Sequence, residues 1–462
     1  MLFNSLHFLV FFLLVTLLFF TFQKQQSRLW LLLIASCYFY MSFLPIYILI
    51  MGGIIITDYF AGLLLQRTQG SARKALLALS LLINIGTLAV FKYYNFFIDN
   101  LQGGFQFFGG SFNSTHLSWL LPIGLSFHTF QAMSYTIEVY RRNQTAERNF
   151  VVYAVYVLFY PQLVAGPIER PQNILPQLHT FRAYNTDNVR TGLSQMLWGF
   201  FKKVVIADRL AMIVDYSYLH THQMSGVALL FAAIAYSFQI YCDFSGYSDI
   251  ALGAARVMNI TLMDNFKQPY LSATITTFWR NWHISLSSWF RDYVYIPLGG
   301  NRKSISRTHL NVFLVFLLSG LWHGANFTFV VWGALHGLLV VIAAVTNPKL
   351  PKTRVYHLFS ILFTFLTVTI LWVFFRSPNI HTALAYIKRI ATCSQGMNYT
   401  GVSRNEVLFS IALIIILLLR EKFIPSFEFK NKQLFYVYAS FLIIVSYLFG
   451  VFAENQFIYF QF

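Results

Sequence analysis

FWRNWHISLSSWFRDYVYIPLGG, residues 278–300, and HLNVFLVFLLSGLWHGANFTFVVWGALHG, residues 309–337, are separated by one short basic turn. Three histidines, His283, His323 and His336, lie inside or beside hydrophobic segments of these stretches. An ionisable side chain is costly at such a position and usually serves a function. This part of the chain is therefore the predicted functional centre.

The composition indicates a polytopic membrane protein. Hydrophobic residues make up 57%, aromatic residues 19% and charged residues only 11% of the 462 positions, which is outside the range of a soluble domain of this length. The formal net charge of +17 could indicate a nucleic-acid ligand, but the Lys and Arg residues are spread through short loops. Cytoplasmic loops that face anionic lipid explain this charge better, so no nucleic-acid partner is expected.

The distribution of basic residues predicts the topology. The first apolar segment lacks a basic n-region and a cleavage site, so a retained span is expected. Lys24 and Arg28 follow it, which places the N-terminus outside and this loop in the cytoplasm. The same rule places 98–116 and 216–226, which contain no Lys or Arg, outside. The basic loops that it places inside are those around 67–74, 141–148, 302–307, 349–354 and 420–432.

The predicted fold is all-α, with about ten to twelve transmembrane helices by apolar length and both termini outside the cytoplasm. Short loops join the spans, so residues 1–462 are predicted to form a single domain. The segment 376–403 is placed outside despite its basic residues and is expected to contain an interfacial helix. Two segments are not ordinary spans. Segment 159–178 contains four prolines and is predicted to be re-entrant or to lie at the cytoplasmic face, and 264–300 is too polar to cross lipid as a regular helix.

The second of these segments contains a helical pattern that includes His283. Aromatic and apolar residues recur at spacings of three and four, which predicts a helix with an aromatic face. The positions on this face are Trp279, Trp282, His283, Leu286, Trp289, Phe290 and Tyr293. Such a helix could also lie on the membrane surface with its rings as anchors, and His283 would then be an incidental interface residue. The residue pattern leaves both interpretations open.

His323 stands in SGLWHGAN, between two apolar runs, with Gly320 and Gly324 beside it. Small neighbours leave room for a substrate or for another backbone to approach. The alternative is a buried histidine that forms a hydrogen bond across the helix bundle. His336, beside Gly333 and Gly337, is predicted to serve packing.

Two polar stripes are candidates for a supporting role. Gln131 and Glu138 share one face of the predicted span 118–140, and Gln239 shares a face with Asp243 in a later apolar segment. These groups could line a water-filled path or could form hydrogen bonds inside the bundle. The second role is the commoner one in membrane proteins.

Four segments read, in order, YPQLVAGPIERP, YCDFSGYSDIALG, NFKQPYLSATITTFWRNWHISLSSWFRDYVYIPLGGNR and LSGLWHGANFTFVVWGALHG. Together they resemble the membrane-bound O-acyltransferase family, and most closely its bacterial branch of alginate O-acetylation and teichoic-acid D-alanylation. The resemblance covers most of the chain. It implies a ring of spans around a thinner centre, with a catalytic histidine at His323 and a second histidine at His283.

The chemistry implied by this resemblance is acyl transfer from a thioester to a hydroxyl, which needs a base for the hydroxyl proton and donors for the oxyanion. Because imidazole titrates near the operating pH, His323 is the predicted general base. His283 is predicted to orient the acyl carbonyl or to act as a second proton-transfer group. Residues predicted to hold His283, to bind the substrate or to support the site are Asn281, Trp282, Trp322, Gly320, Asp243, Gln239, Gln131 and Glu138.

The resemblance also implies a donor and partners. Acetyl-CoA is the expected acyl donor, bound by the basic and aromatic region 264–307 at the cytoplasmic face. No permanently bound cofactor is expected, and Cys37, Cys242 and Cys393 lack metal-ligand spacing, so no metal is expected either. An esterase-like protein and a polysaccharide are the expected partners outside the bacterial cytoplasmic membrane.

Two alternatives stay open from the sequence. The first is D-alanyl transfer from a carrier protein to teichoic acid, in which the cytoplasmic face would bind a protein. The second is a polysaccharide transporter or channel without enzymatic activity, for which many spans and polar stripes are equally natural. A transporter would tolerate the replacement of His323 by alanine, and an acyltransferase would not.

Overall fold

The computed structural model describes residues 1–112, 114–119, 121–164, 166–346, 353–429, 431–452 and 457. The regular structure of these residues is helical, apart from one isolated β-bridge between Met224 and Met397. The predicted all-α fold is therefore confirmed. The chain divides into two compact units, Met1–Val189 with Ala254–Met263 and Arg190–Gly253 with Asp264–Phe462. The prediction of a single domain stays a prediction.

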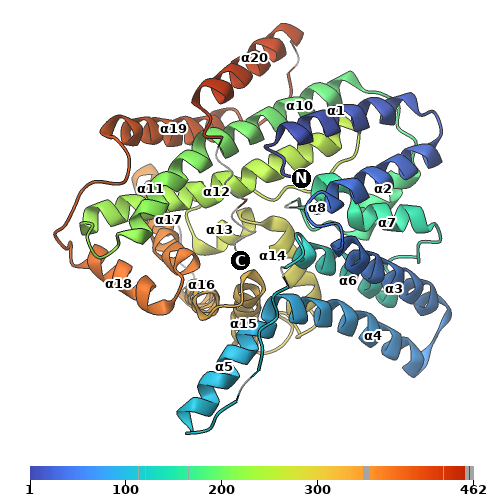
Figure 1. Cartoon of the computed structure of the whole chain (residues 1–462), viewed down its shortest axis with the longest axis horizontal. Helices are drawn as coiled ribbons and strands as arrows, with labels where there is room; N and C mark the ends of the chain where they lie inside the picture. The colour runs from blue at the N-terminus through green and yellow to red at the C-terminus, as the bar shows by residue number, and fades with distance from the viewer. Residues whose placement is uncertain are drawn as a thin grey trace. The chain divides into compact units, whose positions relative to one another are not determined.

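The first unit is built on the N-terminal helices (Figure 1). These are α1 (Leu6–Thr21), α2 (Gln25–Met41), α3 (Tyr47–Arg67), α4 (Gly70–Leu88), the π-helix η1 (Ala89–Tyr93), α5 (Tyr94–Phe107), α6 (Leu125–Arg141), α7 (Phe150–Leu158), α8 (Tyr160–Leu163) and α9 (Pro171–His179). Helix α6 packs against α3 and α4. Between α3 and α4, buried Asp58 accepts hydrogen bonds from Ser80 Oγ at 2.6 Å and Asn84 Nδ2 at 2.7 Å. A buried carboxylate needs such donors, so this cluster fixes α3 against α4.

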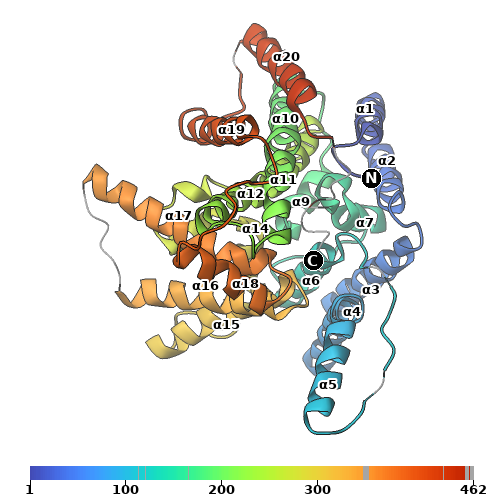
Figure 2. The same ribbon diagram turned by 60° about the vertical axis from the view of Figure 1, so that its left-hand side comes forward.

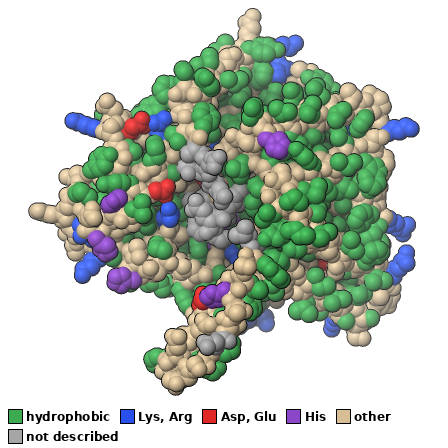
Figure 3. All heavy atoms as spheres, in the orientation of Figure 1, with side chains coloured by type: hydrophobic (Ala, Val, Ile, Leu, Met, Phe, Trp, Pro, Cys, Tyr) green, Lys and Arg blue, Asp and Glu red, His purple; other side chains and the backbone are tan. Residues whose placement is uncertain are grey.

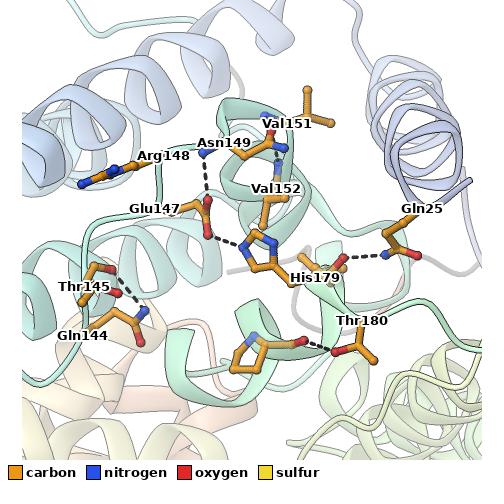
Figure 4. A network of polar contacts seen from close by, with 12 residues as sticks. Gln25, Gln144, Thr145, Glu147, Arg148, Asn149, Val151, Val152, His179 and Thr180 are labelled. Carbon is orange, nitrogen blue, oxygen red and sulfur yellow. Dashed lines mark hydrogen bonds and ion pairs between the residues drawn. The ribbon is translucent and has the colours of Figure 1, made fainter.

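The proline-rich segment 159–178 is interrupted, as its sequence predicts. It contains the short helix α8 and most of α9, with non-helical backbone at residues 166–170. The end of α9 is tied to another loop of the same unit, because His179 Nε2 lies 2.7 Å from Glu147 Oε2 (Figure 4). Its placement at the cytoplasmic face stays a prediction.

The second unit contains the long helix α12 and the functional centre predicted from the sequence. Its elements are α10 (Thr186–Phe200, from Arg190), the π-helix η2 (Phe201–Ala207), α11 (Asp208–Leu219), α12 (Gly226–Val257, up to Gly253), η3 (Pro269–Leu271), α13 (Ile275–Asn281), α14 (Ile284–Phe290), the π-helix η4 (Arg291–Tyr295), α15 (Ile305–His323), α16 (Phe327–Thr346), α17 (Arg354–Arg376), α18 (Ile380–Ala391), α19 (Arg404–Phe423) and α20 (Lys432–Phe449). Helix α16 lies between α15 and α17 and packs on both (Figure 2).

Seven helices in the described part of the chain are long and apolar enough to cross a bilayer. They are Tyr47–Arg67, Gly70–Phe107, Gly226–Val257, Ile305–His323, Phe327–Thr346, Arg354–Arg376 and Lys432–Phe449. Exposed hydrophobic side chains are abundant, including Leu13, Ile34 and Phe60 in the first unit, and Figure 3 shows hydrophobic side chains spread over the region of α1 to α4. The chain is thus a multi-pass membrane protein. Ten to twelve spans would require shorter helices such as α1 to be counted, and both that number and the external termini stay predictions.

Two loop predictions have different outcomes. The segment 376–403 contains a helix, α18, as expected, and its interfacial location stays a prediction. In the basic loops predicted to be cytoplasmic, residues 349–352 and 430 lie outside the described residues.

Candidate active site

The chain around His283 is not the continuous helix that the spacing predicts. Helix α13 ends at Asn281, α14 begins at Ile284, and His283 has a left-handed backbone with φ of 44°. The first N–H groups of a helix have no partner within it. Here Asn265 supplies one, because its carbonyl oxygen accepts a hydrogen bond from Ile284 N at 2.9 Å. A left-handed histidine costs about 1–3 kcal/mol and persists only where its surroundings fix it.

The imidazole of His283 is buried in aromatic surroundings. Its side of α14 faces α12, where the Phe244 ring stands at 89° to the imidazole with the ring centroids 4.6 Å apart. Only 1% of His283 is exposed. Burial lowers the pKa of His283 to about 3, because desolvation disfavours the charged imidazolium. The ring is therefore neutral at physiological pH.

His323 lies next to His283 although forty residues separate them in sequence. It is the last residue of α15 and is buried, and its ring centroid is 6.4 Å from that of His283. Trp332 and Phe375 pack against the His323 ring, each with a centroid distance of 5.2 Å. The structure thus brings together the two histidines that the sequence singles out, while their catalytic roles stay predictions.

Gly320 serves the approach of another backbone, which is one of the two uses expected of it. A Cβ atom on Gly320 would lie 2.3 Å from Phe329 O and 3.2 Å from Gly333 Cα. Helices α15 and α16 therefore cross at these glycines, and no side chain larger than hydrogen fits at position 320 without separating them. The crossing lies one turn before His323 on α15.

His336 serves packing, as predicted. It lies in the middle of α16, is fully buried, and its Nδ1 accepts a hydrogen bond from Trp279 Nε1 at 3.2 Å. The rings of Trp279 and Trp332 each lie 4.9 Å from the imidazole, centroid to centroid. This histidine is held by its neighbours at both the ring face and Nδ1.

The residues predicted to hold His283 contact other groups. Asn281 Nδ2 donates to Ser272 Oγ at 3.1 Å, and the buried Trp282 ring stacks on Phe278 with a centroid distance of 5.5 Å. The turn is instead held by Asn265, nearly twenty residues earlier. Trp322, also in the predicted set, does lie at the site.

Trp322 packs beside both histidines. Its ring centroid is 5.0 Å from that of His323 and 6.1 Å from that of His283. A further ring reaches the site from the C-terminal segment, since buried Phe457 packs on Tyr247 at 4.4 Å and on Phe244 at 5.9 Å between centroids. Phe244 and Phe457 were not among the predicted residues, because an aromatic ring in an apolar segment carries no signal of its own.

A cavity of about 230 Å³ opens between α13, α14, η4, α15 and α16. Its walls are largely apolar, and two arginines, Arg280 and Arg291, belong to its lining. The other lining residues are Thr276, Trp279, Leu286, Ser287, Phe290, Tyr295, Val312, Val315, Phe316, Ser319 and Val340. Ser319 lies one helical turn before His323, on the same face of α15. Neither His283 nor His323 is among these lining residues, although α14 and α15 carry both the two histidines and part of the cavity wall.

Asp243, one of the two residues of the polar stripe on α12, belongs to a buried ion cluster. Lys203 Nζ lies 2.7 Å from Asp243 Oδ1 and 2.8 Å from Asp208 Oδ1, and all three side chains are buried. Gln239, one turn earlier on α12, is half-buried, and its Oε1 has no hydrogen-bond partner among the described residues. Lys203 was not predicted, although a Lys-Lys pair inside the apolar run 196–214 was a usable signal.

Gln131 and Glu138 lie in the first unit and hold its helices together. Gln131 Nε2 donates to Tyr156 O, and Glu138 accepts hydrogen bonds from Gln172 Nε2 at 2.8 Å and Asn143 Nδ2 at 3.0 Å. The second of the two expected roles, hydrogen bonding inside the bundle, therefore describes them. In the described residues no group of three or more His, Cys, Asp or Glu could hold a metal ion, and the absence of a metal stays a prediction.

Comparison with known proteins gives a consistent result. The profile of "MBOAT, membrane-bound O-acyltransferase family" matches residues 107–377. A protein of Pseudomonas putida named "Probable alginate O-acetylase AlgI" is 42% identical over 392 residues, which cover 83% of this chain and 79% of that protein. The "Peptidoglycan O-acetyltransferase" of Helicobacter pylori is 37% identical over 78% of this chain and 73% of its own length. The "Teichoic acid D-alanyltransferase" of Bacillus subtilis is 29% identical over 47% of this chain and 58% of its own length.

Proposed function

This chain belongs to the membrane-bound O-acyltransferase family, and we propose that it passes an acetyl group from cytoplasmic acetyl-CoA across the bacterial cytoplasmic membrane for O-acetylation of an extracytoplasmic polysaccharide. As a member of this family it is an O-acyltransferase. The observation that carries the proposal is the pair of buried histidines, His283 and His323, at the ends of α14 and α15, two of the helices that line a cavity with basic residues.

The relatives support acetyl as the acyl group. Two relatives that match more than three quarters of this chain are named for O-acetylation, one of alginate and one of peptidoglycan. The relative named for D-alanyl transfer matches less than half of it. Because the two acetylation relatives differ in their polymer, the proposal extends to an O-acetylated polysaccharide and not to one sugar.

In the proposed reaction His323 is the general base. It removes the proton from the acceptor hydroxyl as that oxygen attacks the thioester carbonyl, so that an O–C bond forms, the C–S bond breaks and the CoA thiolate leaves and takes up a proton. A neutral imidazole is needed for the first step. The apolar surroundings of the site, with Trp332 and Phe375 against the ring, exclude water that would compete as an acceptor.

His283 is proposed to act on the acyl carbonyl. Its ring lies 6.4 Å from that of His323, centroid to centroid, so both imidazoles can reach one small reacting group between them. A neutral imidazole carries one N–H, which can donate a hydrogen bond to the developing oxyanion. The pKa of His283, lowered by burial, suits a donor that stays neutral throughout.

The cavity is the proposed entry of the donor. Its volume of about 230 Å³ accommodates part of a pantetheine arm and excludes the nucleotide, which would remain at the basic surface. Arg280 and Arg291, both exposed, supply positive charge for the phosphates. On the opposite side of the membrane an esterase-like acyl-accepting protein would complete the transfer to the polymer, and both termini would lie on that side.

The test is acetyl transfer from radiolabelled acetyl-CoA by the purified protein in nanodiscs, where both faces are accessible. His323→Ala is expected to lower turnover by about 10²- to 10⁴-fold, the usual contribution of a general base. His357→Ala, an exposed histidine of α17, is the matched control and should stay within about twofold of the wild type. Equal turnover by wild type and His323→Ala would refute the mechanism. Turnover of a D-alanyl carrier thioester alone would favour the alternative donor.

A further inference from the structure

Asn265 makes four hydrogen bonds around the turn that carries His283. Its carbonyl oxygen accepts from Ile284 N at 2.9 Å, and its side-chain Oδ1 accepts from Ser285 Oγ at 2.6 Å and from Ser285 N at 3.4 Å. Its Nδ2 donates to Ser248 Oγ at 3.3 Å. Asn265 is 2% exposed and Ser285 is fully buried. One side chain therefore links the first turn of α14 to α12.

We propose that Asn265 is the positioning residue for His283. Its hydrogen bonds to Ile284 and Ser285, which follow His283 on α14, hold the left-handed backbone at His283. Its hydrogen bond to Ser248 fixes the distance between α14 and α12. The proposal rests on the function proposed above, in which His283 acts on the acyl carbonyl. Asn265 itself touches neither the substrate nor the reacting atoms in this scheme.

The link to α12 matters because α12 also packs against the imidazole ring of His283. Phe244 and Ser248 are four residues apart and lie on the same face of α12. Phe244 stands edge-on against the imidazole, and Ser248 holds Asn265. These contacts bring α14 and the His283 turn close to α12; Figures 1 and 2 label the two helices. The same pair of helices therefore sets both the backbone of His283 and the orientation of its ring.

The left-handed conformation makes this support necessary. A non-glycine residue adopts it only when the surrounding structure requires it, and histidine is among the side chains that tolerate it. If the side-chain bonds of Asn265 to Ser285 and Ser248 are lost, only the backbone bond to Ile284 N remains, and His283 can relax to an ordinary helical or extended backbone. Either change turns the Cα–Cβ bond and alters the position of the ring relative to His323. A misplacement of about 1 Å lowers the rate of a positioned reaction by about 10²-fold.

The competing explanation is that Asn265 only caps α14 and stabilises the fold. A matched example of such a cap exists in the same unit, where Asn379 Oδ1 accepts a hydrogen bond from Thr382 N at 2.8 Å at the start of α18. Asn379 is exposed, and its side chain forms a hydrogen bond with Thr382 and with neither histidine in the described part of the chain. Asn379→Ala is therefore the control for the loss of a cap.

The experiment is a double-mutant cycle on acetyl transfer by the full chain in nanodiscs. Asn265→Ala is expected to lower kcat by about 10- to 100-fold, with KM for acetyl-CoA within about twofold. In the His283→Ala background, Asn265→Ala should lower kcat no further, because the residue on which it acts is gone. Asn379→Ala should leave kcat unchanged and lower only the unfolding temperature.

Two outcomes overturn the proposal. One is a multiplicative effect of Asn265→Ala and His283→Ala, and the other is an unchanged kcat in Asn265→Ala. If Asn265→Ala does not fold, Ser285→Ala replaces it in the cycle, because it removes only the 2.6 Å hydrogen bond. If His283→Ala has no measurable turnover, His283→Gln, whose amide keeps an N–H donor, replaces it as the background. If the wild type itself transfers no acetyl group, the proposed function is refuted. Failure of the proposed function is therefore distinguishable from failure of the role of Asn265.

Discussion

Replacing Gly320 with alanine tests whether this glycine serves helix packing or substrate binding. The new Cβ would lie 2.3 Å from Phe329 O, whereas real Cβ atoms essentially never come within 3.0 Å of another heavy atom. Helices α15 and α16 must therefore move apart by at least about 0.7 Å, the difference between these two distances. The contact is to backbone, so no side chain can rotate away to relieve it.

The expected change in the free energy of unfolding follows from two opposing effects. Overpacking of a close helix contact costs about 1–3 kcal/mol. The higher helix propensity of alanine returns about 1 kcal/mol, which leaves a net loss of up to about 2 kcal/mol in the free energy of unfolding. Because His323 lies one turn further along α15, the same displacement moves its ring relative to His283. We expect kcat to fall by about 10- to 100-fold.

The assay combines thermal unfolding in nanodiscs with kcat and KM for acetyl-CoA. Gly86→Ala in α4 is the control, because a Cβ there would meet nothing within 4 Å, and it should keep or slightly raise the unfolding temperature. A Gly320→Ala protein with unchanged unfolding temperature and kcat but raised KM would refute the packing argument. That result would place Gly320 in a substrate site.

Two further predictions concern buried charge. Lys203→Met leaves two buried carboxylates without their cation and should lower the free energy of unfolding by about 3–5 kcal/mol. Lys432→Met, at an exposed position, should change the free energy of unfolding by less than about 0.5 kcal/mol in the same denaturation experiment. Equal effects of the two substitutions would contradict the ion cluster. The pKa of His283 is lowered to about 3, so between pH 3 and 6.5 the unfolded chain binds the proton and stability falls as the pH falls through this window. From pH 7.5 to pH 5 the wild type should therefore lose about 2 kcal/mol more than His283→Gln does, and parallel pH profiles of the two proteins would show that the ring is not buried neutral.

The sequence predicts the helices and His323 for the same reason. Long apolar runs must form helices in lipid, and a polar side chain inside such a run stands out against its surroundings. His323 stands out in this way, whereas His283 lies in a segment too polar to span, and the choice of these two histidines over His336 depends on the resemblance to the membrane-bound O-acyltransferase family. The 6.4 Å separation of their rings could not be read from the sequence, because it depends on how α14 and α15 pack.

The break at His283 marks the limit of pattern analysis. Spacings of three and four continue without interruption from Trp279 to Tyr293, so the pattern predicts one helix. The interruption is caused by Asn265, whose carbonyl oxygen binds Ile284 N from outside the pattern. The pairing of Lys203 with Asp243 and the backbone contact at Gly320 are likewise long-range. Periodicity describes one element, and these features arise where two elements meet.

Hydrogen bonding separates the third histidine from the other two. The indole N–H of Trp279 can only donate, so Nδ1 of His336 must carry the lone pair in their 3.2 Å contact. A neutral imidazole with an unprotonated Nδ1 carries its proton on Nε2, so neither nitrogen of His336 has a lone pair left for a hydroxyl proton while this bond lasts. His336 also sits in mid-helix, where Trp279 and Trp332 hold its ring. His283 and His323 instead occupy the ends of α14 and α15 with their ring centroids 6.4 Å apart, and this difference favours that pair over His336 for the proposed base.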